Sequence, residues 1–122
     1  MLESKIQNQI RCALSKFGAV FRTNSGQFWQ GSRMTLKQAS AMYGPETLVL
    51  VKLRSVDGLP AGFSDLLFVG PGNVAFVETK NEVGHLRPEQ KNFLKRMHSM
   101  GYVAGVARSV DEAVKLIGTG TD

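Results

Sequence analysis

The chain has 122 residues, 43% of them hydrophobic, which is enough for one domain of residues 1–122 with a buried core. Its formal net charge of +5 favours a polyanionic partner, first a nucleic acid and second an anionic membrane surface. The single cysteine, Cys12, excludes an internal disulfide and a cysteine-based zinc cluster, and the sequence lacks both a membrane-spanning apolar run and a signal peptide, so we expect a cytoplasmic protein without a membrane partner.

The N-terminal half is predicted to begin with a helix and then to alternate between strands and a short helix. Apolar residues recur at helical spacing up to Phe17, and Gly18 suits the helix end. Gly44 and Pro45 end a second helical pattern. The expected elements are a helix at 3–17, a strand at 19–23, a turn or hairpin at 24–31, a helix at 35–43 and a strand at 47–55.

The C-terminal half is predicted to hold a hairpin followed by helix, strand and helix. Pro88 suits the first turn of a helix, and Ser109 can cap the last one with Glu112 in the capping-box position. Residues 118–122 are expected to fray. The expected strands are 63–70, 74–80 and 102–107, and the expected helices are 88–100 and 110–117. This order predicts a mixed α/β domain.

Three charged side chains meet where the predicted hairpin opens. Asp65 lies near the start of one strand, whereas Glu78 and Lys80 end its antiparallel partner, on one face if the strand alternation holds. Two close carboxylates repel each other, and a Mg²⁺ or Mn²⁺ ion removes that repulsion. With a lysine to orient water, this is equipment for metal-assisted phosphodiester hydrolysis. The alternative is an ordinary salt-bridged strand end.

These residues carry a family resemblance. The pair "SD" (64–65) followed by "ETK" (78–80) resembles the PD-(D/E)XK nuclease signature, and the whole chain resembles the stand-alone VRR-NUC nucleases of phages and bacteria. Ser64 stands where the broader superfamily often has proline, but a small residue is usual in the narrower family. The matching segments are "ESKIQNQI", "VFRTNSGQFWQG", "GFSDLLFV", "VAFVETKNEVGHLRPEQKNFL" and "GYVAGVARSVDEA".

The resemblance implies a PD-(D/E)XK restriction-endonuclease-like core, with a central mixed β-sheet flanked by helices. It also implies that Mg²⁺ or Mn²⁺ is bound by Asp65, Glu78, the Thr79 carbonyl and Glu3. Lys80 would position the attacking water, and Gln90 would lie near the site. Gln90, like Gln7 one turn after Glu3, could instead be a polar flanking residue.

Further residues are expected to contact DNA. The family segment holding Arg22, Asn24 and Ser25 implies contact with phosphate or orientation of the site. A basic stripe, defined by Arg87, Lys91 and Lys95 at four-residue spacing, suits phosphate contact, although such a stripe can also be a solvated helix face. Phe28 and Trp29 could stack on bases, but packing is the favoured interpretation. His85 and His98 are expected to be surface residues.

By resemblance the chain is expected to be an endonuclease that cuts branched DNA, especially four-way (Holliday) junctions, leaving 5′-phosphate and 3′-hydroxyl ends, in a bacterial or phage-infected cell. A homodimer would present two active sites to a symmetric junction. The alternatives are a nuclease on nicks, flaps or DNA ends that acts with a partner protein, and a non-catalytic DNA-binding module on a nuclease scaffold.

Overall fold

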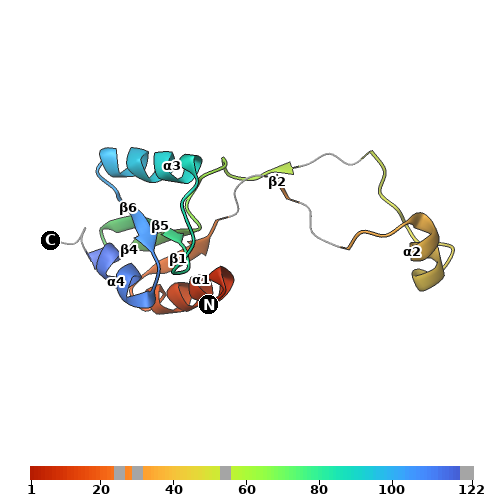
Figure 1. Cartoon of the computed structure of the whole chain (residues 1–122), viewed down its shortest axis with the longest axis horizontal. Helices are drawn as coiled ribbons and strands as arrows, with labels where there is room; N and C mark the ends of the chain where they lie inside the picture. Colours follow the sequence, from red (N-terminus) through yellow and green to blue (C-terminus); the bar gives the residue numbers. More distant parts are fainter. Residues whose placement is uncertain (24–26, 29–31, 53–55, 119–122) are drawn as a thin grey trace.

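The computed structural model describes residues 1–23, 27–28, 32–52 and 56–118 (Figure 1). Of the predicted site residues, Asn24, Ser25 and Trp29 lie outside the described residues, as does the side chain of Phe28. The helices are α1 (Glu3–Leu14), α2 (Leu36–Tyr43), α3 (Pro88–Ser99) and α4 (Val110–Gly118). The strands are β1 (Ala19–Arg22), β2 (Gln27–Phe28), β3 (Val56–Asp57), β4 (Leu66–Gly70), β5 (Asn73–Thr79) and β6 (Val103–Ala107).

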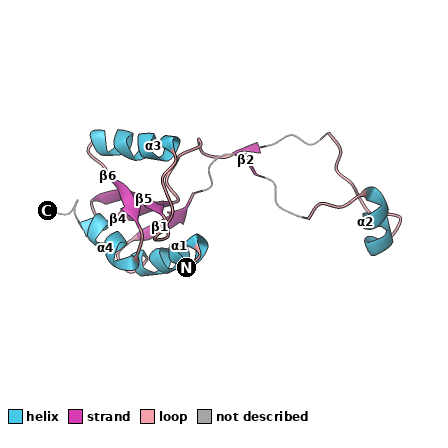
Figure 2. Ribbon diagram, viewed as in Figure 1, coloured by secondary structure: helices cyan, strands magenta, loops and turns pink. Residues whose placement is uncertain are grey.

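A four-stranded mixed sheet in the order β1-β4-β5-β6 forms the body of the protein. β4 is antiparallel to β1 and to β5, whereas β6 runs parallel to β5. Figure 2 shows α3 on one face of this sheet, with α1 and α4 on the other. The predicted central mixed sheet flanked by helices is therefore confirmed. Strands β2 and β3 pair separately as a two-stranded sheet.

The β4–β5 hairpin determines where the charged residues lie. Gly70 pairs with Asn73, so Pro71 and Gly72 form a two-residue turn, in which Gly72 has a φ of 70° that suits glycine. At the open end of the hairpin Leu66 pairs with Val77. The next residues along the two strands are Asp65 and Glu78, which are therefore neighbours at this end.

Alternating side chains of the hairpin fill the core on both faces of the sheet. On the α1 and α4 face, the buried cluster includes Leu66 and Val77 of the hairpin with Ile10 of α1 and Ile117 of α4. On the α3 face, aromatic rings pack edge to face or tilted, with Phe76 5.6 Å from Phe93 and Phe93 4.5 Å from Phe63 between ring centroids. The hairpin is thus fixed from two sides.

Several predicted helix boundaries need small corrections. α1 ends at Leu14, three residues before the predicted end, because Leu14 is the last buried position and Phe17 is 51% exposed. At the other end of the chain Gly118, predicted to fray, belongs to α4. The remaining helices and the hairpin strands lie within a few residues of their predicted bounds.

An arm defined by residues 32–52, with α2 near its far end, extends away from the sheet (Figure 1). The strand predicted at 47–55 is wrong for residues 47–52, which form no strand. β-branched and apolar residues favour a strand only where a neighbouring strand can pair with them, and here Leu48 and Leu50 are 94% and 81% exposed. α2 has no buried residue, although Thr35 and Gln38 form a capping box at its start.

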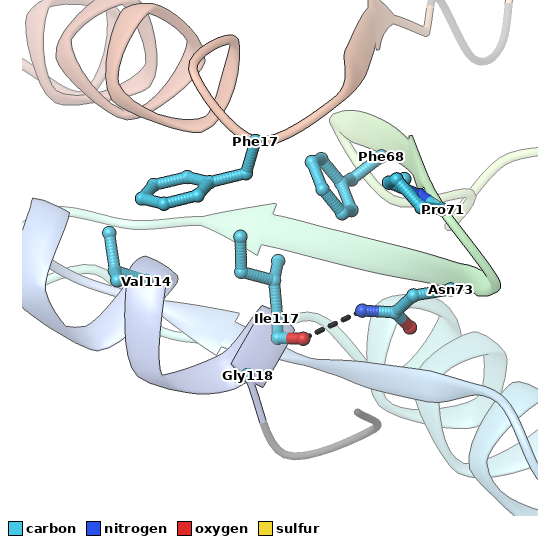
Figure 3. Close-up of a pocket in the computed structure, with 8 residues that line it drawn as sticks. Phe17, Phe68, Pro71, Asn73, Val114, Ile117 and Gly118 are labelled. Carbon is cyan, nitrogen blue, oxygen red and sulfur yellow. Dashed lines mark hydrogen bonds between the residues drawn. The ribbon is translucent and has the colours of Figure 1, made fainter. Parts of the chain in front are cut away.

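An apolar pocket of about 400 Å³ lies at the turn of the hairpin, at the end opposite to Asp65 and Glu78 (Figure 3). Phe17, Phe68 and Ile117 line it, and the Asn73 amide donates a hydrogen bond of 2.7 Å to the Ile117 carbonyl. It offers no charged side chain for chemistry. Within the described part of the chain, no helix is both long enough and apolar enough to cross a membrane.

Candidate active site

Two carboxylates meet at the open end of the β4–β5 hairpin. The Asp65 carboxylate accepts hydrogen bonds from the Thr79 main-chain N–H at 3.0 Å and from the Thr79 hydroxyl at 2.8 Å. These bonds fasten Asp65, one residue before β4, to the last residue of β5. Glu78 lies beside Asp65 and is 1% exposed. The structure therefore brings together the two acids that the sequence predicted as neighbours.

Glu78 is a proton-binding group in the metal-free protein. Burial, followed by repulsion from Asp65, raises the pKa of Glu78 from 4.5 to about 8, despite the opposing effect of Lys80. A carboxyl with this pKa holds a proton at neutral pH. A divalent cation at the same place would compensate both negative charges, which is the electrostatic role predicted for it.

Gln90 holds Glu78 against the start of α3. Its amide nitrogen donates a hydrogen bond of 3.1 Å to Glu78 Oε1, and its amide oxygen accepts one of 2.9 Å from the Arg87 main-chain N–H. Gln90 is 5% exposed, so this bridge is buried. The interpretation of Gln90 as a polar flanking residue is wrong, because its side chain contacts the predicted metal ligand directly.

Lys80 lies one residue beyond the end of β5, where strand alternation no longer fixes the direction of the side chain. Its Nζ is 3.7 Å from Oε1 of Glu3 on α1, whereas Glu78 is bonded to Gln90 on α3. Lys80 is buried, which is costly for an ammonium group unless it has a partner. Glu3 supplies that partner, so α1 completes the surroundings of Lys80.

The donor set fits a divalent cation with oxygen ligands. Glu78 Oε2 is buried and has no hydrogen-bond partner among the described residues. The main-chain N–H and C=O of a strand residue point to the same neighbour, so the Thr79 carbonyl points towards the Asp65 side. The described residues contain no group of three His, Cys, Asp or Glu side chains arranged for a metal. Glu3 as a ligand stays a prediction.

The predicted DNA-contacting residues that the structure describes lie around this end of the sheet. Arg22 is exposed at the end of β1 and pairs with Leu66, next to Asp65. Arg87 is the N-cap residue that precedes α3, and its Nε is 3.3 Å from the Glu89 carboxylate. Lys91 and Lys95 are exposed on the same helix. The basic stripe therefore starts beside Gln90 and runs away from the carboxylates.

Sequence reasoning missed the roles of two polar side chains. The Thr79 hydroxyl donates to Asp65, and the Gln7 amide on α1 in turn donates to that hydroxyl at 3.4 Å. Gln7 is therefore more than a flanking residue. The alternation of side chains along β5 could have predicted the role of Thr79. Thr79 lies between Glu78 and Lys80, so its side chain must point to the face opposite to Glu78, towards α1.

Comparison with known families and structures supports the same fold. The VRR-NUC domain family matches residues 1–111. A solved structure described as "VRR_NUC domain" is 24% identical, covers 95% of this chain and 94% of its own, and has a TM-score of 0.57. Another, described as "VRR_NUC domain protein", is 17% identical, covers 99% and 88%, and has a TM-score of 0.53. No curated protein matches the sequence.

Proposed function

The chain belongs to the VRR-NUC domain family, which makes it a nuclease-type DNA-processing protein, and we propose that it is a Mg²⁺- or Mn²⁺-dependent endonuclease. The observation that carries the proposal is the pair formed by the buried Glu78 and the half-buried Asp65, with one oxygen of Glu78 unpartnered among the described residues. Such a pair costs stability in the folded protein unless a proton or a cation balances it. A hard divalent cation is the balancing group that also serves phosphodiester hydrolysis.

Asp65, Glu78 and the Thr79 carbonyl would hold the metal, with Glu3 completing the ligand set from α1. When bound, the metal supplies Lewis-acid stabilisation of the charge that develops on the phosphate. Gln90 keeps Glu78 in place through its 3.1 Å hydrogen bond, and Thr79 does the same for Asp65. Both carboxylates are therefore positioned before metal or DNA arrives.

Lys80 would orient the attacking water. Its ammonium, which has three N–H donors, is held by the pair with Glu3 at 3.7 Å. The water oxygen loses a proton to solvent and forms a bond to phosphorus, the bond from phosphorus to the 3′-oxygen breaks, and the 3′-oxygen takes up a proton from solvent. This direction of cleavage leaves 5′-phosphate and 3′-hydroxyl ends, as the resemblance implies.

The basic stripe of α3 would guide the DNA to the site. Arg87, Lys91 and Lys95 start beside the buried Gln90, and Arg22 lies on the opposite flank, where it pairs with Leu66. Asn24 and Ser25, from the same family segment as Arg22, are proposed to contact phosphate too. Such contacts fix the position of the backbone without reading the base sequence.

A homodimer acting on branched DNA is the finer part of the proposal. The arm exposes Leu36, Met42, Tyr43, Leu48 and Leu50, each by more than 60%. Exposed apolar clusters of this kind mark interaction surfaces, and a second copy of the chain is the partner we propose. A two-fold dimer would offer two active sites to the two strands of a Holliday junction.

We further propose that residues 1–122 act as one nuclease domain and work in the cytoplasm of a bacterium or a phage-infected host. Both statements follow from the resemblance and from the sequence composition, which favours a nucleic-acid partner.

The proposal is tested by incubating the purified protein with linear duplex, single-stranded, nicked, flapped and four-way-junction DNA, with Mg²⁺ and with Mn²⁺. We expect cleavage of the junction that EDTA abolishes. Asp65→Ala is expected to abolish cleavage while leaving DNA binding largely intact, because Asp65 is not one of the basic residues proposed to contact phosphate. Metal-independent cleavage, or Asp65→Ala activity within a few-fold of wild type, would remove this site from the mechanism.

A further inference from the structure

Arg108, the first residue after β6, joins that strand to the turn that follows Lys80. Its Nη1 donates hydrogen bonds to the carbonyl oxygens of Asn81 at 2.6 Å and Gly84 at 2.7 Å. These carbonyls belong to the first and last residues of the turn 81–84. Inside the turn, Asn81 Oδ1 accepts hydrogen bonds from the main-chain N–H groups of Val83 at 3.1 Å and Gly84 at 2.7 Å. One guanidinium therefore fixes both ends of the turn.

Arg108 is itself held at the end of the sheet. Its main-chain N–H donates a 2.6 Å hydrogen bond to Oε2 of Glu112, in the first turn of α4. The preceding residue, Ala107, accepts a 3.2 Å hydrogen bond from the Lys80 main-chain N–H. Two adjacent residues at the end of β6 therefore hold this region. Ala107 bonds to the backbone of Lys80, and Arg108 closes the turn that follows Lys80.

The turn 81–84 lies next to the side chains of Lys80 and Glu3. A Cβ atom built on Gly84 would lie 3.3 Å from Cδ of Lys80 and 3.4 Å from Oε2 of Glu3. A methyl group there would fit only if a neighbouring atom moved by a few tenths of an ångström, so the turn limits the space open to both side chains. Among the described residues, no carboxylate lies within ion-pair distance of the Arg108 guanidinium, so its hydrogen bonds serve the turn.

We propose that Arg108 is a positioning residue for Lys80. By closing the turn 81–84 it keeps Gly84 next to the Lys80 side chain, so that the ammonium stays paired with Glu3. The inference rests on the proposed nuclease function and deepens it. It proposes that a residue outside the metal ligands and the DNA-contacting residues affects the rate of the chemical step.

The test compares wild type with Arg108→Ala, Arg108→Lys and the single-charge control Lys115→Ala, which changes an exposed lysine near the other end of α4. Arg108→Ala should lower kcat by about 10- to 100-fold, the range for a small misplacement of a catalytic group, with KM for junction DNA changed by less than about twofold. Arg108→Lys should recover only part of kcat, because an ammonium lacks the rigid fork of donors. Lys115→Ala should match wild type.

Hydrogen exchange measured without metal or DNA gives a readout independent of activity. The amides of Val83 and Gly84 should exchange at least about tenfold faster in Arg108→Ala, while those of β4 stay protected. If Arg108→Ala fails to fold, Gly84→Ala provides the second test with Arg108 intact. Its methyl group would lie 3.1 Å from Oδ1 of Asn81 and 3.3 Å from Cδ of Lys80, so it should displace the turn relative to Lys80 and lower kcat in the same way.

Three results would overturn the inference. The first is an unchanged kcat in both Arg108→Ala and Gly84→Ala. The second is an increased KM with a log-log salt slope smaller by about one, which would make Arg108 a phosphate contact. The third is unchanged exchange in the turn 81–84. If instead wild type cuts none of the DNA substrates while exchange in Arg108→Ala accelerates, the proposed function fails but Arg108 still organises the turn.

Discussion

Glu78 is the residue that links the stability of the fold to its chemistry. It is almost completely buried, its neighbour Asp65 is acidic, and its pKa is raised to about 8. A structural carboxylate in a protein core is normally neutralised by a cation on a nearby side chain. Here the Lys80 ammonium is paired with Glu3 at 3.7 Å. The site thus retains an electrostatic cost that a metal ion would relieve.

The metal-free protein should lose stability as the pH rises from about 4.5 to about 8. Across this window the folded protein keeps a proton on Glu78 that the unfolded chain, whose pKa is near 4.5, has released. Folding therefore takes up a proton, and stability falls with increasing pH. Urea unfolding in EDTA at several pH values across this window measures the effect. Glu78→Gln should remove it, and an equal pH dependence in that variant would assign the effect to other groups.

Glu78→Gln and Lys80→Ala should impair different properties, namely metal affinity and turnover. Glu78→Gln removes a metal-binding charge and the repulsion with Asp65, so metal affinity should fall while the metal-free protein is at least as stable as wild type. Lys80→Ala leaves both carboxylates, so metal should still bind while turnover falls by about 10²- to 10⁴-fold. Calorimetric Mn²⁺ titration and a cleavage assay distinguish them. Normal turnover in Lys80→Ala would exclude Lys80 from the mechanism.

At the scale of elements, α3 has two roles at two places along its length. Its N-terminal turn supplies the buried Gln90 that holds Glu78, and its exposed face carries Lys91 and Lys95. The helix packs on the sheet through Phe93 against Phe76, which is two residues before Glu78. In the proposed mechanism this one helix would both contact DNA and hold the metal ligand Glu78 in place.

The double substitution Lys91→Ala with Lys95→Ala should weaken binding to all DNA sequences alike, because phosphate contacts carry no sequence information. The slope of log K against log salt concentration should shrink by about two, near one unit for each lost contact. Fluorescence anisotropy on two unrelated duplexes over a range of salt concentrations measures this. Substituting Lys115 provides the charge control. A slope equal to that of wild type would mean that the stripe is only a solvated face.

Elements that depend on residues close together in the sequence could be predicted, whereas features that depend on distant residues could not. The hairpin, the start of α3 at Pro88 and the cap of α4 depend on turn and capping residues within a few positions, and the sequence was sufficient for them. Residues 47–52 were wrongly predicted as a strand, because pairing depends on a distant neighbour that composition cannot supply. For the same reason the contacts of Gln7 and Arg108, made across elements, were not predictable from their surroundings in the sequence.

For the molecule as a whole, the arm is the main departure from a closed globular shape (Figure 1). Its large apolar side chains are exposed, whereas Leu66 and Val77 of the sheet, Ile10 of α1 and Ile117 of α4 are buried. A segment of this kind contributes little to the stability of one isolated chain. The arm is therefore where association between copies can be tested without touching the active site.

Replacing Leu48 and Leu50 together by aspartate should convert a dimer into a monomer, because both side chains are exposed in the single chain and charges there would oppose burial between copies. Light scattering coupled to size exclusion gives the mass, and circular dichroism checks that the fold is retained. Met100→Asp, at an exposed position beyond α3, is the control and should leave the mass unchanged. A wild-type monomer at all concentrations would contradict the homodimer.

The two-residue turn between β4 and β5 also bears on the order in which the protein folds. Asp65 and Glu78 belong to one contiguous hairpin, and short hairpins close within about 1–10 μs, before contacts of long sequence separation form. The two carboxylates therefore meet early, and their repulsion acts on the folding transition state as well as on the native state. Above the pKa of Glu78, the Glu78→Gln substitution should accelerate folding more than it slows unfolding.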